Sequence, residues 1–261
     1  MDDASAINLR FRPGSIDYDG AMSRNYGQGR ALRPEVAELW RGVLDPYFSS
    51  LKSRRVLDLG SGTGRFSSLL AEWFGVRVVG IEPSRGMQTA ANASLGVSYA
   101  AGTAEAIPLS ANCVDLVWIS QVWHHVRDLH ACARELHRVL LPGARVIIRG
   151  TFGDPRGGRT MYRYFPQIKR MAESFPSLSH TVNTLAEAGF IHESSRAILQ
   201  PTFADLRELA RRTRFRADST LASLSDDEFN RGQEALDRAA DISPSDPVID
   251  TIDLAVFRLS S

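Results

Sequence analysis

The sequence contains little cysteine and almost no net charge. Only Cys113 and Cys132 occur among 261 residues, and neither lies at a spacing typical of metal or redox motifs. This excludes a disulfide framework and indicates a reduced, cytoplasmic compartment. Because 31 Lys and Arg residues oppose 30 Asp and Glu residues, the formal net charge is +1. No global field would therefore attract nucleic acid or an anionic membrane surface.

Long apolar runs, internal repeats and an apolar leader are also missing. No run approaches the ~18 consecutive apolar residues of a membrane span, and the N-terminus carries charge from Asp2 onward. We therefore expect no membrane partner. With 43% hydrophobic residues, a chain of this length can bury a full core, which favours one globular domain with additions.

The segment from Arg55 to Phe66 carries the strongest local pattern. A short apolar strand ends in alternate glycines, Gly60, Gly62 and Gly64, where the backbone must bend and approach a ligand. Apolar residues then recur at helical spacing from Phe66 onward, so a helix begins where the glycines end. Such a turn presents free N–H groups and the positive end of a helix dipole, which predicts a nucleotide-binding site.

Two ligands suit this geometry, a dinucleotide and S-adenosylmethionine. Arg65 stands where the dinucleotide motif has its third glycine. Asp58 precedes the first glycine by two residues, where its carboxylate would repel a pyrophosphate but could face the ammonium group of a methionine moiety. The stretch resembles motif I, D-x-G-x-G-x-G, of the class I S-adenosylmethionine-dependent methyltransferases.

Segments that follow motif I extend this resemblance. Glu82 ends a strand predicted over 76–82, at the spacing at which an acid meets ribose hydroxyls; the alternative is a solvated carboxylate. Met87 either packs on the adenine or fills a gap in the core. Gly102 to Pro108 resembles the family's G-D-A-E-x-L-P segment, with Thr103 in place of the Asp that would accept from the adenine amino group. A hydroxyl accepts this bond without a charge, so the contact should be weaker.

Two adjacent histidines follow the strand predicted over 114–120. Ser120 to Val126 resembles the S-x-x-x-H-H-V run of ubiquinone, menaquinone and secondary-metabolite methyltransferases. Ligands of open α/β sheets lie at the carboxyl ends of strands, so we predict the reaction crevice here. One of His124 and His125 would act as a base and the other would be a packed histidine. No metal is expected, because no third ligand stands at a suitable spacing.

The segment 150–177 departs from the α/β rhythm and is rich in arginine and aromatic residues. We predict that this insertion forms the substrate wall; the alternative is a solvated basic segment with a core-facing aromatic stripe. Nearer the N-terminus, Tyr26 and Arg30 resemble residues of the lid that covers the cofactor in many small-molecule methyltransferases, with a solvent loop as the alternative. Thr202 and Ser225 each open an expected helix capping box, with Asp205 and Glu228 as the respective third residues.

The resemblance implies a fold, a domain organisation and a set of site residues. The fold is α/β, a Rossmann-like, doubly wound, seven-stranded and mainly parallel sheet with an antiparallel edge strand. An N-terminal arm and lid helix would occupy 1–50, and the methyltransferase domain 51–261. The expected cofactor-binding residues are Tyr26, Arg30, Asp58, Gly60, Ser61, Gly62, Gly64, Glu82, Pro83, Met87, Thr103, Ala104, Glu105, Ser120 and Gln121. The expected catalytic residues are His124 and His125, and the expected substrate-binding residues are Arg149, Arg159, Tyr162 and Arg163.

The implied function is transfer of a methyl group from S-adenosylmethionine to O, N or C of a small-molecule acceptor in biosynthesis or secondary metabolism. The cations near the insertion suggest an anionic or carrier-linked acceptor, and nucleic acid is not expected. Two alternatives stay open: a Rossmann-type NAD(P)-dependent oxidoreductase and a non-catalytic S-adenosylmethionine-binding protein. The acceptor atom and the oligomeric state do not follow from the sequence.

Overall fold

The computed structural model describes residues 16–49, 51, 54–91, 93–154, 157–243, 245 and 247–260. Residues 1–15 of the expected arm and Arg156 of the insertion lie outside them. The strands are β1 (Arg55–Leu59), β2 (Arg77–Glu82), β3 (Val97–Ala101), β4 (Val114–Ser120), β5 (Leu140–Gly150), β6 (Phe190–Phe203) and β7 (Val248–Leu259). The α-helices are α1 (Ala21–Arg30), α2 (Pro34–Phe48), α3 (Arg65–Phe74), α4 (Arg85–Thr89), α5 (Leu129–Val139), α6 (Pro166–Glu173), α7 (Leu178–Glu187), α8 (Leu206–Thr213), α9 (Ser219–Ala222) and α10 (Asp226–Ile242). Two 3₁₀ turns, η1 (Trp123–His125) and η2 (Thr160–Arg163), complete the elements.

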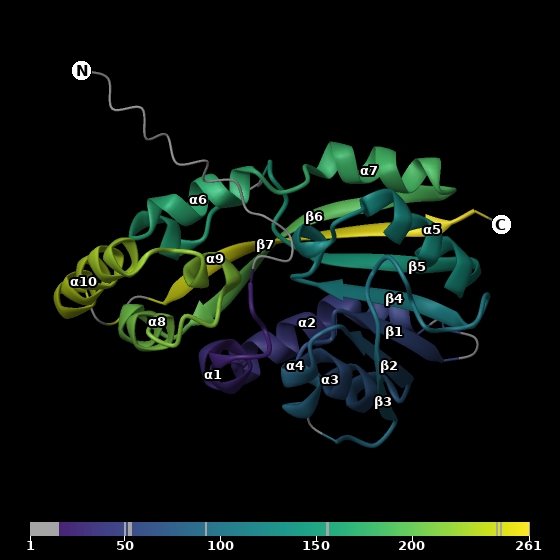
Figure 1. The fold of residues 1–261 in the computed structure, drawn as a ribbon, viewed down its shortest axis with the longest axis horizontal. Helices are drawn as coiled ribbons and strands as arrows, with labels where there is room; N and C mark the ends of the chain where they lie inside the picture. Colours follow the sequence, from purple (N-terminus) through teal and green to yellow (C-terminus); the bar gives the residue numbers. More distant parts are fainter. Residues whose placement is uncertain are drawn as a thin grey trace.

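The strands form one seven-stranded sheet in the order β3-β2-β1-β4-β5-β7-β6 (Figure 1). The pairs from β3 through β5 are parallel, whereas β7 runs antiparallel to both β5 and β6. This confirms the predicted fold class, and it places the antiparallel strand one position in from the edge. The chain reverses its direction of winding between β1 and β4, where an open sheet leaves a crevice at the carboxyl ends of its strands.

Helices cover both faces of the sheet because each presents an apolar face to it. Residues of α5 and α7 form one hydrophobic cluster with the strands, and residues of α2 and α3 form another on the other face. The signals in the sequence set several of these boundaries. Asp128 caps α5 by accepting the N–H of Ala131 at 2.9 Å, and Ser225 and Glu228 form the expected capping box of α10. The expected box at Thr202 is wrong, because Thr202 still belongs to β6 and Asp205 caps α8 instead.

A separate group of helices stands at one end of the sheet, at the left of Figure 1. We call η2, α6, α8, α9 and α10 the helical cap, since a third hydrophobic cluster joins side chains of all five. Phe165 is fully buried in this cluster, and Tyr162 and Tyr164 pack against it. The aromatic residues of the insertion therefore face a core, as the alternative interpretation of this segment stated.

The segment of Tyr26 and Arg30 is helical. Both residues belong to α1, which contacts α4 and α8, and Gly29 lies so close to the chain before α9 that an added Cβ would stand 2.5 Å from the Cβ of Ala217. The side chain of Arg30 is only 19% exposed. The solvent-loop alternative is therefore wrong, because α1 is packed between other helices.

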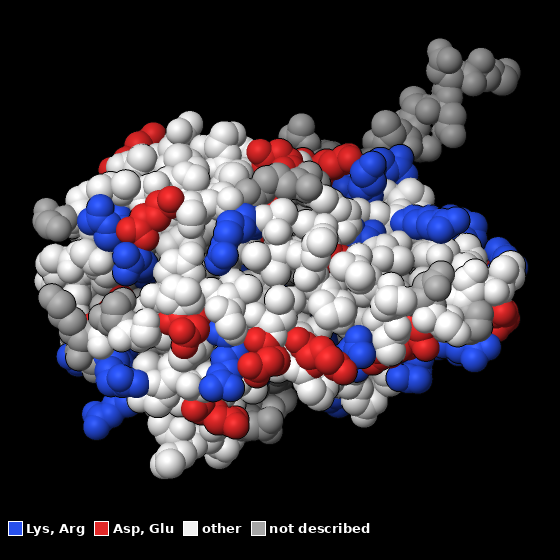
Figure 2. Space-filling view, turned by 180° about the vertical axis from the view of Figure 1, so that it is seen from behind, with Lys and Arg blue, Asp and Glu red and all other residues white. Residues whose placement is uncertain are grey.

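Charges of both signs are interspersed on the face shown in Figure 2. This pattern fits the small net charge of the chain. No described helix combines the length and the apolar character needed to cross a bilayer.

Gly64 should tolerate substitution less well than another left-handed glycine. Its φ is +72°, and an added Cβ would lie 1.9 Å from the Tyr99 hydroxyl oxygen, whereas Gly143 has φ +76° and no atom within 4 Å of an added Cβ. We expect Gly143→Ala to lower the free energy of unfolding by about 1–2 kcal/mol, the cost of left-handed backbone. Gly64→Ala should lose a further ~1–3 kcal/mol through overpacking. Urea denaturation measures both; equal losses would contradict the proposed clash.

Candidate active site

The glycine turn after β1 is built from three left-handed residues, Gly60, Gly62 and Gly64, with φ of +71°, +56° and +72°. The turn is fastened to β2, because the N–H groups of Gly60 and Ser61 both donate to the carbonyl of Ile81, at 2.8 and 3.1 Å. An added Cβ at Gly60 would lie 2.4 Å from a methyl group of Val122. Glycine is therefore required here by both backbone conformation and space.

Glu82 organises the same turn. One carboxylate oxygen accepts the N–H of Gly62 at 2.9 Å, and the other accepts the N–H of Ser84 at 3.0 Å. Burial raises the pKa of this carboxyl, while the two backbone bonds oppose the shift. Glu82 thus holds the loops that follow β1 and β2 together. Its contact with ribose hydroxyls stays a prediction, for which further lone pairs on its oxygens are available.

A cavity of about 540 Å³ opens at the carboxyl ends of β1, β2, β3 and β4. Its wall combines the glycine turn with the loops that follow the other three strands. The sequence-predicted site residues that line this cavity are Gly60, Pro83, Thr103, Ala104, Glu105 and His125. Four strands remote in sequence therefore deliver their predicted residues to one place.

Two other predicted cofactor residues lie behind this wall. Asp58 is 2% exposed and accepts a hydrogen bond from the Ser67 hydroxyl at 2.6 Å. Burial raises the pKa of Asp58 to about 7. Met87 is also 2% exposed and packs in a small cluster with Met22 and Ala217, so it fills the core. The contacts predicted for Asp58 and Met87 with a ligand stay predictions.

Glu105 fixes the loop after β4 as well as lining the cavity. Its carboxylate accepts the N–H of Arg127 at 2.8 Å and that of Asp128 at 3.3 Å. Thr103 bridges to Ala106 in the loop after β3. Both side chains thus belong to a wall that is already ordered by its own hydrogen bonds.

The two histidines have different surroundings. His124 stacks on Phe175, with ring centroids 4.2 Å apart at 12°, and is 7% exposed, so it is the packed histidine of the pair. His125 lines the large cavity, and its Nε2 forms a hydrogen bond of 3.1 Å with the Tyr18 hydroxyl, in which the donor depends on the tautomer of the ring. Burial lowers the pKa of His125 to about 4 and that of His124 well below its ordinary value. Among the described residues, no group of three His, Cys, Asp or Glu residues could hold a metal ion.

The chain before α1 covers part of the large cavity, which the sequence did not indicate. Ile16 to Asp19 line it. Asp19 accepts hydrogen bonds at 2.7 Å from both the Ser84 hydroxyl and the Gly86 N–H. An added Cβ at Gly86 would lie 2.8 Å from the Asp19 backbone, so the close approach needs a glycine. The residues 16–20, which we call the strap, are thus attached to the loop that opens α4.

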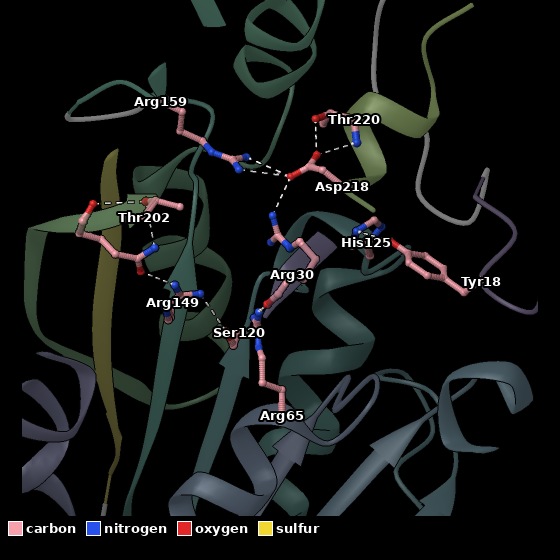
Figure 3. Close-up of polar contacts among 11 residues, drawn as sticks. Tyr18, Arg30, Arg65, Ser120, His125, Arg149, Arg159, Thr202, Asp218 and Thr220 are labelled. Atoms are coloured by element: carbon pink, nitrogen blue, oxygen red, sulfur yellow. Dashed lines mark hydrogen bonds and ion pairs between the residues drawn. The ribbon is translucent and has the colours of Figure 1, made fainter. Parts of the chain in front are cut away.

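Beyond β4 lies a group of arginines, drawn in Figure 3, of which Arg149 is buried and Arg30, Arg65 and Arg159 are half-buried. Gln121 follows Ser120 with a left-handed φ of +61°, and its N–H donates to the Arg149 carbonyl at 2.7 Å. Non-glycine residues adopt this conformation rarely, and often at functional sites. The guanidinium of Arg149 donates to the Ser120 hydroxyl at 3.2 Å and to Gln200 at 2.7 Å. The predicted residues Ser120, Gln121 and Arg149 are thus neighbours.

Asp218 connects two further predicted residues, Arg30 and Arg159. It pairs with Arg30 at 3.1 Å and with Arg159 at 3.3 Å (Figure 3). Although burial acts against ionisation, the two arginines hold the pKa of Asp218 well below its usual range. Sequence reasoning missed Asp218, whose only local signal is its position as the N-cap of α9.

The other two predicted substrate residues do not join this group in the same way. Arg163 is exposed and lies over the ring of its neighbour Tyr164, 6.0 Å from its centroid. Tyr162 packs against the core of the helical cap. Tyr26 lines a small cavity of about 30 Å³ together with Arg30, Gln121 and both histidines.

Comparisons with known proteins agree on one family. Residues 57–148 match a family model described as a methyltransferase domain. An uncharacterized methyltransferase of Mycobacterium tuberculosis is 37% identical over 145 residues, covering 55% of this chain and 56% of the relative. A malonyl-[acyl-carrier protein] O-methyltransferase of Methylococcus capsulatus is 31% identical over 156 residues, covering 57% and 52%. The chain thus aligns with about half the length of these relatives.

A solved structure from Anabaena variabilis shares the fold over nearly the whole chain. It is a candidate methyltransferase from an antibiotic biosynthesis pathway, 21% identical, with a TM-score of 0.69 over 87% of this chain and 99% of that one. At this identity the likeness concerns the fold alone. It extends beyond residues 57–148 to the helical cap, where the sequence comparisons give less coverage.

The stability of the protein should fall in weak acid because of His125. Its pKa of about 4 lies below the ~6.5 of a solvated histidine, so the unfolded chain binds a proton first as the pH drops. The contribution is fully present above about pH 6.5 and is lost on the way to pH 4. We expect His125 to contribute a fall of on the order of 2–3 kcal/mol to the free energy of unfolding over this range, which His125→Gln should remove. His124, whose pKa is also lowered, contributes a further fall that remains in both proteins.

Urea unfolding at several pH values measures this effect. Asp58, whose pKa is raised, contributes with the opposite sign over a similar range. It is present in both proteins and cancels in the difference. The exposed His180, replaced by Gln, is the matched control. Equal pH slopes for wild type and His125→Gln would contradict the assignment.

Proposed function

We propose that the chain is a class I S-adenosylmethionine-dependent methyltransferase, and that it transfers the methyl group of this cofactor to O, N or C of a small-molecule acceptor. The large cavity carries the proposal, because it lies at the carboxyl ends of four parallel strands and is lined by the glycine turn. Its volume of about 540 Å³ falls within the ~300–1,000 Å³ of small-molecule sites.

The residues of the cavity wall fit this cofactor. The bare turn at Gly60 lets a ligand approach the backbone, and Glu82 stands behind the turn, where ribose hydroxyls are expected. Thr103 and Ala104 offer a hydroxyl and a small apolar surface to the adenine. The cofactor supplies an electrophilic methyl group on a sulfonium. The chain has to bind and orient an acceptor and exclude water, a proximity effect that contributes ~7–11 kcal/mol in favourable cases.

His125 is the better placed of the two histidines for proton transfer. It lines both the large cavity and the small cavity that leads toward the arginines, whereas His124 lines only the second of these two. Its lowered pKa keeps the imidazole unprotonated near pH 7, the state that a base requires, and an anionic acceptor beside the ring would raise that pKa toward neutrality. We assign His125 as the base for an acceptor that must lose a proton, and His124 as its packed support.

An anionic acceptor, free or linked to a carrier, fits the same site. The relative from Methylococcus capsulatus is named for a malonyl group on an acyl carrier protein, and the crevice of this chain has Arg149 and Arg159 beyond β4. We place the reaction in biosynthesis or secondary metabolism, because this relative is named for a carrier-bound acyl group.

Replacing Glu82 tests the cofactor site. Glu82→Gln removes a charged acceptor, which should weaken binding of S-adenosylmethionine by about 1.5–3 kcal/mol, equivalent to roughly tenfold or more in Kd. Calorimetry on the full chain measures it. Glu234→Gln on the exposed face of α10 is the control, and thermal unfolding without ligand reports any loosening of the turn. Unchanged affinity would contradict the ribose assignment.

The same calorimetry separates the alternative functions. Binding of NAD without binding of S-adenosylmethionine would favour an oxidoreductase. Binding of S-adenosylmethionine with no formation of S-adenosylhomocysteine against carboxylate, phosphate, amine and hydroxyl acceptors would favour a non-catalytic protein. Formation of S-adenosylhomocysteine that depends on one acceptor class would support the proposed transfer.

The strap and α1 should be held more firmly when the cofactor site is filled. The two bonds of Asp19 attach the strap to the loop that opens α4, at the rim of the cavity. In wild type we expect S-adenosylhomocysteine to slow tryptic cleavage after Arg24 and Arg30 several-fold, as for loops that gate a site. Asp19→Ala should speed cleavage and reduce the protection, while Asp227→Ala on α10 should not. Cleavage independent of S-adenosylhomocysteine would argue against a gating role.

A further inference from the structure

A second cavity, of about 50 Å³, lies on the other side of β4 and has no lining residue in common with the large cavity. It is enclosed by α1, α2 and α3 and by the strands β5, β6 and β7. Six arginines contribute to its wall: Arg30, Arg33, Arg65, Arg149, Arg159 and Arg212. We call it the arginine cavity. Its volume exceeds the ~10–15 Å³ that one water molecule needs, so the cavity has room for a small polar group.

The acids near this cavity neutralise only part of its charge. Glu208 pairs with Arg212 at 2.6 Å and lies 3.8 Å from Arg33. Asp218 is shared by Arg30 and Arg159. Asp250 lines the wall and accepts the N–H of Thr160 at 2.7 Å. Glu35, which is exposed, lies 3.5 Å from Arg33. Four carboxylates therefore stand near six guanidinium groups.

Arg65 and Arg149 carry the excess. Arg65 donates to the carbonyl of Arg30 and lies over the ring of Phe66. Arg149 donates only to the neutral groups of Ser120 and Gln200, and its guanidinium lies 4.5 Å from the ring centroid of Trp40. Among the described residues, no carboxylate forms an ion pair with either side chain. Asp58 acts electrostatically on Arg65, but burial raises the pKa of Asp58 to about 7, so this carboxyl supplies only part of a counter-charge. A buried cation with so little compensation is costly, and a bound anion would relieve that cost.

Unused donors point to the same conclusion. The Nε atoms of Arg149 and Arg159 are buried and have no hydrogen-bond partner. Burial lowers the pKa of Arg65 to about 10 and that of Arg149 well below its usual range, and the neighbouring arginines act in the same direction. An anion with two or three oxygens would meet these donors and relieve both the missing bonds and the repulsion.

A third cavity lies between the arginine cavity and the large cavity. This cavity, of about 30 Å³, shares Arg30, Gln121 and Arg159 with the arginine cavity. It shares Tyr18 and His125 with the large cavity. The three cavities therefore lie next to one another in the order glycine turn, His125 and arginines, so an anion held by the arginines would be on the side of His125 away from the glycine turn.

We propose that the arginine cavity binds a carboxylate or phosphate group of the methyl acceptor, with Arg65 and Arg149 as its principal ligands. This inference rests on the proposed function. It differs from the sequence-based prediction in its residues: Arg65 enters the site, whereas Arg163, which is exposed, lies outside it. The selectivity of the protein for an anionic acceptor would thus depend mainly on Arg65 and Arg149.

Inorganic phosphate is the probe for this proposal. The full chain is first saturated with S-adenosylhomocysteine and then titrated with phosphate by calorimetry, with potassium chloride holding the ionic strength constant. We expect saturable binding of one phosphate per chain. Arg65→Gln and Arg149→Met should each raise the Kd for phosphate about tenfold or more, and leave the Kd for S-adenosylhomocysteine within about twofold. Arg163→Gln, which removes the same charge from the surface, should leave both unchanged.

Each other outcome overturns the proposal in a distinct way. Absence of phosphate binding to the loaded chain would show that the arginines are structural. Competition between phosphate and S-adenosylhomocysteine, or loss of affinity for S-adenosylhomocysteine but not for 5′-methylthioadenosine in Arg65→Gln, would assign the cavity to the cofactor's own carboxylate. Equal weakening by Arg163→Gln would indicate surface attraction. If Arg149→Met unfolds, Arg65→Gln and the wild type still decide the question. Failure to bind S-adenosylhomocysteine at all would contradict the proposed function, and this titration reports it separately.

Discussion

The parallel pairing of β4 with β1 is the constraint on which the site depends. The chain winds outward from β1 through β2 to β3, then returns to place β4 on the other side of β1. The loops after β1 and β4 consequently leave the sheet in opposite directions, which opens the crevice between them. Val122, after β4, lies against Gly60, after β1, and closes the floor of that crevice. The glycine requirement at the turn is thus a consequence of strand order as well as of the ligand.

Local signals in the sequence were sufficient to predict the sheet and the loops after its strands that line the large cavity. Alternate glycines, a strand ending in an acid and a helix capped by Asp128 each act within a few residues, so their structure follows from short-range chemistry. The strand predicted at 114–120 is observed with those bounds. The predicted residues that line the large cavity were found for the same reason, since they lie in the loops that follow strands, whereas residues 16–19 of the strap were not found.

The contacts made by the helical cap and the strap could not be predicted in this way. Arg30 meets Asp218 across 188 positions of sequence, and Tyr18 meets His125 across 107. No periodicity encodes such pairs. The sequence-based prediction grouped Arg163 with Arg149 and Arg159 because all three are arginines near the insertion. In the structure Arg163 is exposed, whereas Arg149 is buried and the side chain of Arg159 is only 12% exposed. The burial of Met87 could not be predicted either. Met87 packs against Met22 of α1, and nothing in the sequence indicated that these two segments meet.

The position of β7 has a consequence for how the chain folds. Strand β6 pairs only with β7, and β7 is the strand that joins it to β5. During synthesis β6 leaves the ribosome before α8, α9 and α10, and it has no neighbour in the sheet until β7 follows them. The β5–β7 pairing is among the least local in the chain, and contacts of large sequence separation form slowly. We therefore expect the first five strands to fold early as a unit, and the arginine-lined side of the protein to be completed last, when the C-terminal strand enters between two strands that precede it.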